Sequence, residues 1–192
     1  MSFSLTLSHV GIYVVDMPRM VDFYSGCLGF AVSDRGPARG GGEIVFMTRD
    51  PREHHQFVLA NGRPAELPFN LINQLSFRVD SLDTLRELHR GLASEAGVEN
   101  LGPTCHGNAV SVYFHDPEGN RVELLTGTPW YIPQPIRFDV DLSLPDEQLW
   151  ATVEAKCRSM PGFKTREAWE ADISRRIAEA TAARRSRLAA VH

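Results

Sequence analysis

The chain has 192 residues, a formal net charge of −4, 43% hydrophobic residues and 23% charged residues. A chain of this size and composition can bury a core as one large domain or two small ones, which excludes disordered and fibrous classes. No overall basic field exists to hold nucleic acid or anionic lipid by counterion release. We therefore expect neither nucleic acid nor a membrane among the partners, while a small neutral or anionic substrate remains open.

The compartment is predicted from the cysteines and from the apolar runs. Cys27, Cys105 and Cys157 are odd in number, widely spaced and without a CxxC pair, so neither a disulfide framework nor a zinc knuckle is indicated. The N-terminal stretch has no basic region before its apolar part, and nowhere do about 18 apolar residues run together. We expect a reducing, cytoplasmic setting.

Two segments of the chain repeat one order of elements. In the first, LSHVGIYVVD predicts an alternating strand at residues 7–15, followed by a helix from about Met17 to Cys27 that Gly29 ends. In the second, INQLSFRVD predicts a strand near residues 72–79, with Ser81 as the N-cap of the next helix. Each helix is followed by two further strand-like runs, EIVFMT and HQFVLA in the first segment and AVSVYF and RVELLT in the second.

The two segments can be superposed by a constant shift. A shift of 65 residues places His9 on Gln74 and Val58 on Glu123. We therefore predict two βαβββ modules, about 5–66 and 70–127, within a domain of residues 1–134. The loop DRGPARGGGE at 34–43 is expected to form part of the pocket wall.

The residues after Gly127 differ in character from the repeat. The run TPWYIPQPI is a stiff connector because it carries three prolines in nine residues. Two helices are predicted beyond it, from Leu144 to about Ser159 and from about Thr165 to Leu188. We expect this extension, residues 135–192, to serve self-association as a homodimer and to expose Trp150 and Trp169.

Strand alternation assigns side chains to faces, because residues two apart point to the same side. The helix-side sets are Val10, Ile12 and Val14 in the first module, and Leu75, Phe77 and Val79 in the second. The opposite face carries His9, Gly11 and Tyr13 in the first module, and Gln74, Ser76, Arg78, Arg121 and Glu123 in the second. This second face is polar in both modules, as the wall of a cavity between curled sheets would be.

Three residues of the polar face could hold a metal ion. A mid-strand carboxylate such as Glu123 is costly to bury unless it is paired or binds a metal. A lone strand histidine is more often hydrogen-bonded structure than a ligand, but two equivalent modules facing each other would bring His9, Gln74 and Glu123 together. One nitrogen and two oxygen donors suit Fe(II) or Mn(II) better than a closed structural zinc site.

Other residues are candidate substrate contacts. Tyr13 lies on the polar face, and His115 shares the strand parity of Tyr113 at the mouth of the DPEGN turn. Alternation lets only one of the adjacent His54 and His55 point into the cavity, and parity with Val58 selects His54.

The paired βαβββ pattern, LSHVGIYVVD with its following helix, EHHQFVL and HGNAVSVYFHDPEGNRVELL resemble the vicinal oxygen chelate superfamily. That superfamily includes glyoxalase I, bleomycin-resistance proteins and type I extradiol dioxygenases. The resemblance covers about residues 5–134. Within it, the EHH run and the HG...S.Y..DP.GN..E spacing are most similar to single-domain extradiol dioxygenases of the dihydroxybiphenyl type.

The resemblance implies roles for individual residues. His9 and Glu123 match metal ligands, Tyr113 matches the tyrosine that hydrogen-bonds the catecholic oxygen, and His106 matches a histidine acting as acid or base. Gln74 stands where the extradiol pattern has its second histidine, and an amide oxygen is a weaker donor to iron than imidazole. Glutamine is an accepted ligand in some glyoxalase I enzymes. Glyoxalase I, however, resembles a four-ligand set with a carboxylate from each module, and Val58 is the partner of Glu123 here.

The expected fold is therefore α+β, with two βαβββ modules forming a curled mixed sheet around a metal cavity and with C-terminal helices. The resemblance implies cleavage of a small aromatic diol by dioxygen at a divalent metal, Fe(II) first, with Mn(II) or another metal as alternatives. Two other functions stay open: a glyoxalase-like isomerase or lyase that needs no oxygen, and a binding protein that sequesters an aromatic compound. Oxygen uptake separates the first two, and bound metal separates both from the third.

Overall fold

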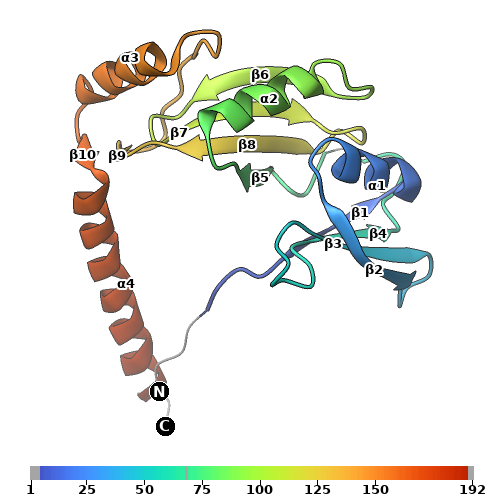
Figure 1. Ribbon diagram of the computed structural model, residues 1–192. Helices are drawn as coiled ribbons and strands as arrows, with labels where there is room; N and C mark the ends of the chain where they lie inside the picture. Colours follow the sequence, from blue (N-terminus) through green and yellow to red (C-terminus); the bar gives the residue numbers. More distant parts are fainter. Residues whose placement is uncertain (1–4, 68, 190–192) are drawn as a thin grey trace. The chain divides into compact units, whose positions relative to one another are not determined.

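The computed structural model describes residues 5–67 and 69–189, with side chains through residue 184. The first module consists of β1 (Val10–Val14), α1 (Met17–Gly26), β2 (Ala31–Pro37), β3 (Glu43–Thr48) and β4 (Phe57–Asn61). The second consists of β5 (Leu75–Arg78), α2 (Leu82–Leu92), β6 (Glu99–Cys105), β7 (Ala109–His115) and β8 (Arg121–Gly127) (Figure 1). The predicted α+β class and the two βαβββ modules are confirmed.

Each module forms its own four-stranded sheet. The strand orders are β1-β4-β3-β2 and β5-β8-β7-β6, so the same topology occurs twice. In the first sheet β1 runs parallel to β4, while β2, β3 and β4 pair antiparallel. This is the order that a strand, a crossover helix and a three-stranded meander produce.

The chain divides into two compact units. The first contains residues up to 77, residues 83–102 and residues 112–124, and the second contains residues 78–82, 103–111 and the chain from 125 onward. Strands β6, β7 and β8 therefore contribute residues to both units. The expected domain boundary at residue 134 stays a prediction.

The core of the first module follows the predicted alternation of β1. Ile12 and Val14 are buried while Gly11 and Tyr13 are exposed. The helix α1 begins after Asp16, whose carboxylate accepts a hydrogen bond from the Arg19 amide at 3.1 Å, as an N-cap does. Its buried residues meet the sheet through aromatic contacts such as the Tyr24–Phe57 pair, whose ring centroids lie 4.6 Å apart.

The prediction of a loop at residues 34–43 is wrong for its first part, because residues 31–37 form the edge strand β2. The sequence AVSDRGP shows no apolar alternation, and almost all of its residues are exposed. The strand exists because its backbone pairs with β3, with a bulge between Val32 and Asp34. Polar residues, a bulge and a terminal proline are typical of an edge strand, and none of them is a strand signal in a sequence.

The DPEGN turn between β7 and β8 connects the second module to the first within the first unit. The Glu118 carboxylate accepts hydrogen bonds from the backbone amides of Val15 and Asp16, both at 2.8 Å, where α1 begins. It also pairs with the Arg63 guanidinium at 3.3 Å. A carboxylate at a helix N-terminus is favourable because the free amides and the helix dipole point toward it.

The buried Asp116 holds the backbone of the same turn through hydrogen bonds. Its carboxylate accepts hydrogen bonds from the backbone amides of Glu118 and Asn120 at 3.0 and 2.9 Å. The buried Tyr24 hydroxyl donates to it at 2.9 Å, and burial, with the negative charge of Asp116 second, raises the pKa of Tyr24 well above its usual value. The turn that precedes β8 is therefore held by α1 as well as by its own backbone.

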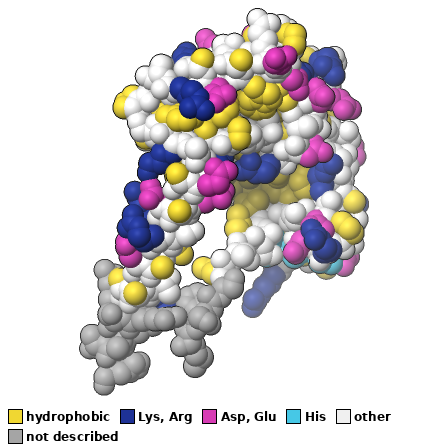
Figure 2. Space-filling model, turned by 60° about the vertical axis from the view of Figure 1, so that its left-hand side comes forward, with side chains coloured by type: hydrophobic (Ala, Val, Ile, Leu, Met, Phe, Trp, Pro, Cys, Tyr) yellow, Lys and Arg dark blue, Asp and Glu magenta, His cyan; other side chains and the backbone are white. Residues whose placement is uncertain are grey.

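The C-terminal extension adds β9 (Trp130–Tyr131), α3 (Asp146–Arg158), β10 (Lys164–Thr165) and α4 (Arg166–Ala189). Both predicted helices are present. Because β9 pairs with β10, the aromatic pair at 130–131 lies beside the helices of the extension. Figure 2 shows acidic and basic side chains mixed along α4, and Arg175 pairs there with Glu179 at 2.9 Å.

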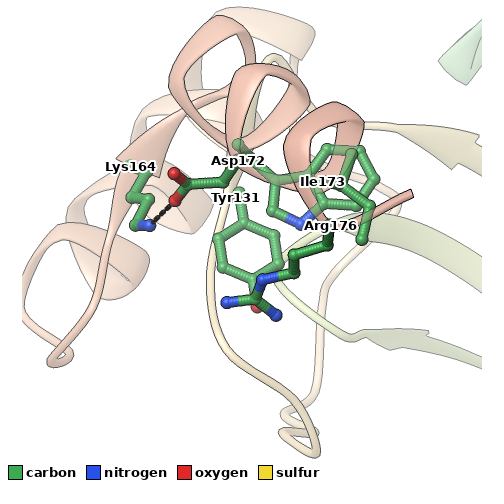
Figure 3. A pocket seen from close by; sticks show the side chains of 6 residues that line it. Tyr131, Lys164, Asp172, Ile173 and Arg176 are labelled. Atoms are coloured by element: carbon green, nitrogen blue, oxygen red, sulfur yellow. Dashed lines mark hydrogen bonds and ion pairs between the residues drawn. The ribbon is translucent and has the colours of Figure 1, made fainter. Parts of the chain in front are cut away.

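The expected exposure of Trp150 and Trp169 is wrong, since both are half-buried. Trp150 packs edge-on against Trp130 with centroids 6.5 Å apart, and Trp169 stacks on Tyr131 at 5.5 Å. The connector folds back through β9 and covers them. The cavity beside Trp169 measures only about 30 Å³, room for little more than a water molecule, and the Lys164–Asp172 ion pair lies at its side (Figure 3).

A search of the described helices finds none whose length and apolar character would let it cross a membrane.

Candidate functional site

The candidate site is built around Glu123 on β8. This carboxylate is only 5% exposed, and three donors satisfy it. The Tyr113 hydroxyl donates to Oε1 at 2.7 Å, the Ser76 hydroxyl to Oε2 at 2.6 Å and the Gln74 amide to Oε2 at 2.9 Å. Burial of an ionised carboxylate is tolerated here because charge-assisted hydrogen bonds replace its water.

The internal repeat explains why these residues meet. In the first module Gly11 pairs with Val58 across β1 and β4. The 65-residue shift maps this pair onto Ser76 and Glu123, which are in direct contact. Gln74, two residues before Ser76, lies on the same face and also donates to the Ser76 hydroxyl at 2.9 Å.

Tyr113 is the electrostatically distinctive member of the group. Burial, followed by its hydrogen bond to Glu123, raises the pKa of Tyr113 to about 12. The phenol therefore keeps its proton at neutral pH and acts as a donor. The Arg121 guanidinium lies 4.2 Å from the centroid of the Tyr113 ring and opposes part of this rise in pKa.

His9 lies in a separate group of rings on the first module. Its ring centroid is 4.3 Å from that of His55, and its Nδ1 lies 3.3 Å from the Ser8 hydroxyl. His55 in turn contacts the Phe46 ring at 5.0 Å. Burial, with the adjacent imidazoles second, lowers the pKa of His55, so this ring favours its neutral form.

The choice of His54 as a substrate contact stays a prediction, although His54 and His55 do not follow the alternation of β4. The His54 side chain is 58% exposed, and it reaches His55 through an Nδ1–Nδ1 contact of 2.9 Å. It is His55 whose ring lies against His9. Strand β4 begins only at Phe57, so residues 54–56 precede the strand and do not follow its alternation.

Tyr13, His115 and His106 are the remaining predicted contacts. Tyr13 is 67% exposed on β1, and His115 Nδ1 lies 2.9 Å from the Asn100 side-chain amide. His106 belongs to the second unit, where its Nδ1 lies 2.8 Å from the carbonyl oxygen of Ile136. Their roles toward a substrate stay predictions.

The donor types in this group fit a divalent cation, since a carboxylate and an amide oxygen are both accepted ligands. Among the residues that the structure describes, no set of three or more His, Cys, Asp and Glu side chains is arranged to hold a metal ion. The predicted set contains only two residues of these types, His9 and Glu123, because Gln74 supplies an amide. The structure brings Gln74 and Tyr113 into contact with Glu123, whereas the described contacts of His9 are with Ser8 and His55.

The sequence interpretation missed the role of Ser76, although it placed this residue on the correct face. Its hydroxyl makes the shortest of the three hydrogen bonds to Glu123. The signal that could have found it is the repeat, since parallel pairing of the first and last strand of each module puts residues 76 and 123 side by side.

Comparison with known proteins identifies relatives of this fold. The profile of the Glyoxalase/Bleomycin resistance protein/Dioxygenase superfamily matches residues 6–124. Biphenyl-2,3-diol 1,2-dioxygenase 3 of Rhodococcus globerulus is 30% identical over 129 residues, which are 65% of this chain and 64% of that enzyme. The chain thus spans less than two thirds of the dioxygenase.

Two further relatives match over nearly their whole length. An uncharacterized protein of Pseudomonas aeruginosa is 30% identical over 131 residues, which are 66% of this chain and 91% of that protein. The solved structure of a glyoxylase/bleomycin resistance protein/dioxygenase domain from Frankia sp. EAN1pec is 25% identical. It superposes with a TM-score of 0.55 and covers 66% of this chain and 100% of that one.

Proposed function

Because the chain belongs to the Glyoxalase/Bleomycin resistance protein/Dioxygenase superfamily, we propose that it is a metal-dependent extradiol dioxygenase cleaving a catechol-like aromatic ring. One observation carries the proposal: a buried carboxylate, Glu123, lies in direct contact with Gln74 and with a protonated tyrosine, Tyr113. The similarity to a biphenyl-2,3-diol dioxygenase supports the choice of an aromatic diol and dioxygen as substrates.

In this proposal Glu123, Gln74 and His9 hold the divalent metal, Fe(II) first and Mn(II) or another metal as alternatives. Their donor types leave room for a substrate, unlike a closed structural zinc site. When bound, the metal would supply Lewis-acid activation of a diol and of dioxygen. Gln74 has an amide oxygen to offer because its nitrogen is the atom that donates to Glu123.

The other residues handle protons. The Tyr113 hydroxyl would turn its one proton from Glu123 to a ring oxygen and stabilise the charge that develops there. His106 takes up and returns a proton, and His54, Tyr13 and His115 contact the substrate. Both oxygen atoms of one dioxygen enter the diol, so the reaction consumes no external reductant. The C-terminal helices serve a homodimer in this proposal.

Metal analysis and oxygen uptake test the proposal together. The protein is purified without oxygen, its metal is measured, and oxygen consumption is followed with catechol and biphenyl-2,3-diol. We expect about one metal ion per chain and one molecule of dioxygen consumed per molecule of diol. Treatment of the protein with a chelator should abolish oxygen uptake. Bound metal without oxygen uptake would instead place the chain with the isomerase or lyase chemistries.

A second candidate function, binding of an aromatic compound without turnover, is favoured by the hydrogen bonds of the buried polar groups. Within the described residues, no fully buried side-chain nitrogen or oxygen lacks a partner, and the donors of the chain that satisfy Glu123 include Tyr113, Ser76 and Gln74. Such a network is stable without a cation, as expected for a protein that binds an aromatic compound without turnover. Saturable binding of a diol with neither bound metal nor oxygen uptake would select this function.

A further inference from the structure

Arg121 lies next to the proposed site but has no role in it so far. It precedes Glu123 by two residues on β8, so the two side chains leave the strand on the same face. Its guanidinium carbon lies 4.2 Å from the centroid of the Tyr113 ring, and the residue is half-buried. A cation thus lies over the ring whose hydroxyl contacts Glu123.

The charge of Arg121 is not used by the neighbouring carboxylate. Both oxygens of Glu123 already accept hydrogen bonds from Tyr113, Ser76 and Gln74. In the part of the chain that the structure describes, no hydrogen bond or ion pair engages the Arg121 guanidinium, which lies over the face of the Tyr113 ring. A guanidinium has five N–H donors, and a contact with an aromatic face leaves them available to an acceptor.

These observations describe a receptor for an anion. A planar guanidinium binds a carboxylate through paired, charge-assisted hydrogen bonds, and partial burial strengthens them. Stacking on Tyr113 holds the Arg121 fork in place, so little side-chain freedom is lost when an anion binds. The chain as a whole is acidic, with a formal charge of −4, so attraction of an anion to this face depends on local cations.

We propose that Arg121 binds a carboxylate substituent of the substrate, so that the diol cleaved at this site is an aromatic acid. The inference rests on the proposed function, because it places the diol beside Tyr113 and Glu123. Arg121 would determine specificity by binding the carboxylate, while Tyr113 donates to a ring oxygen. Neutral diols would lack the group that Arg121 binds and would leave its cation unpaired.

The test compares acidic and neutral diols on the full-length protein. Isothermal titration calorimetry without oxygen measures binding of catechol, 2,3-dihydroxybenzoate and 3,4-dihydroxybenzoate to the wild type, Arg121→Gln and Arg121→Lys. At least one acid should bind about tenfold tighter than catechol, and Arg121→Gln should remove that advantage, given the strength of hydrogen bonds to charged groups. Arg121→Lys keeps the charge without the fork and should retain part of it.

A matched control separates local from general charge effects. Arg52→Gln removes one positive charge from an exposed arginine that pairs with Asp50, and it should leave the preference for the acids unchanged. Circular dichroism during heating shows whether each variant is folded. Equal affinity for catechol and both acids in the wild type, or an unchanged preference in a folded Arg121→Gln variant, would overturn the inference.

Failure of the inference and failure of the proposed function give different results. Benzoate, which has no diol, is titrated into metal-depleted protein. Binding of benzoate that Arg121→Gln abolishes supports the anion receptor even if no diol consumes oxygen, in which case only the ring-cleavage proposal falls. Oxygen uptake with catechol that is indifferent to Arg121→Gln and to a carboxylate refutes the receptor and leaves ring cleavage in place.

Discussion

The two modules share one topology but place different chemistry at equivalent positions. In the first, Gly11 pairs with Val58, and a Cβ added at Gly11 would lie 3.5 Å from the Val58 Cβ. In the second, the corresponding Ser76 and Glu123 form a hydrogen bond of 2.6 Å. An apolar contact in one copy is thus a buried polar network in the other.

The comparison teaches that the fold does not need the polar network. The first module closes its sheet with an aliphatic side chain where the second buries a carboxylate, which costs free energy unless every donor and acceptor is paired. A buried network that the architecture does not require is a reason to look for function at that place. The rings of His9, His55 and Phe46 give the first module a different surface, rich in imidazole and without the carboxylate.

The largest effect is expected when the Glu123 carboxylate is removed, because it is the main chemical difference between the two modules. Glu123→Ala should abolish metal binding and leave three donors without their acceptor, with a loss of unfolding free energy of about 1–3 kcal/mol. His9→Ala should also abolish metal binding. The equivalent change in the first module, Val58→Ala, should leave metal content intact. Metal analysis and urea unfolding measure these effects, and full metal content in both Glu123→Ala and His9→Ala would refute the ligand set.

The tyrosine should matter for turnover more than for metal binding. Tyr113→Phe removes the hydroxyl that donates to Glu123, and we expect turnover to fall by about 10²-fold, as for loss of a donor that stabilises developing charge. Metal content should stay near that of the wild type. Because burial and Glu123 raise the pKa of Tyr113 to about 12, its ionisation should not shape the activity profile near neutral pH. Tyr131→Phe, in β9 of the C-terminal extension, is the matched control. Equal activity of the two variants would mean that Tyr113 is only a packing residue.

Gln74 offers a further test of how the two modules differ, since the repeat places His9 and Gln74 at equivalent sites. Gln74→His would make the two modules alike there and supply a stronger donor to iron. We expect tighter iron binding with oxygen uptake kept or increased, and a loss of metal in Gln74→Ala. Titration of the metal-depleted protein with Fe(II) without oxygen measures this. Unchanged metal content in Gln74→Ala would show that Gln74 is not a ligand.

The smallest effect is expected at the first strand of each module. Ser76→Ala removes one of three hydrogen bonds to Glu123 and should lower the unfolding free energy by about 1 kcal/mol. Gly11→Ala at the equivalent position should change it by at most about 0.5 kcal/mol, because the added Cβ makes only ordinary contact with Val58. Urea unfolding of both variants decides the point, and equal losses would mean that Ser76 merely fills space.

The sequence predicted those parts of the fold whose side chains alternate. The faces of β1, β5 and β8 follow from period-2 patterns, and those of β5 and β8 place Gln74, Ser76 and Glu123 on one face. The edge strand β2 escaped prediction because only backbone pairing specifies it. Strand alternation could not decide between His54 and His55, because both residues precede the first residue of β4. Hydrogen-bond partners such as Ser76 needed the strand register, which the repeat contains but composition does not.

The DPEGN turn has a consequence for how such a protein can change during evolution. Asp116 and Glu118 fix the start of β8 through the turn backbone, Tyr24 and the first amides of α1. None of these bonds involves the side chains of Arg121 or Glu123. Substitutions on the face of β8 that carries Arg121 and Glu123 can therefore accumulate while these bonds hold the start of the strand in place. Related proteins could therefore change their substrate preference while the hydrogen bonds of the DPEGN turn keep the fold intact.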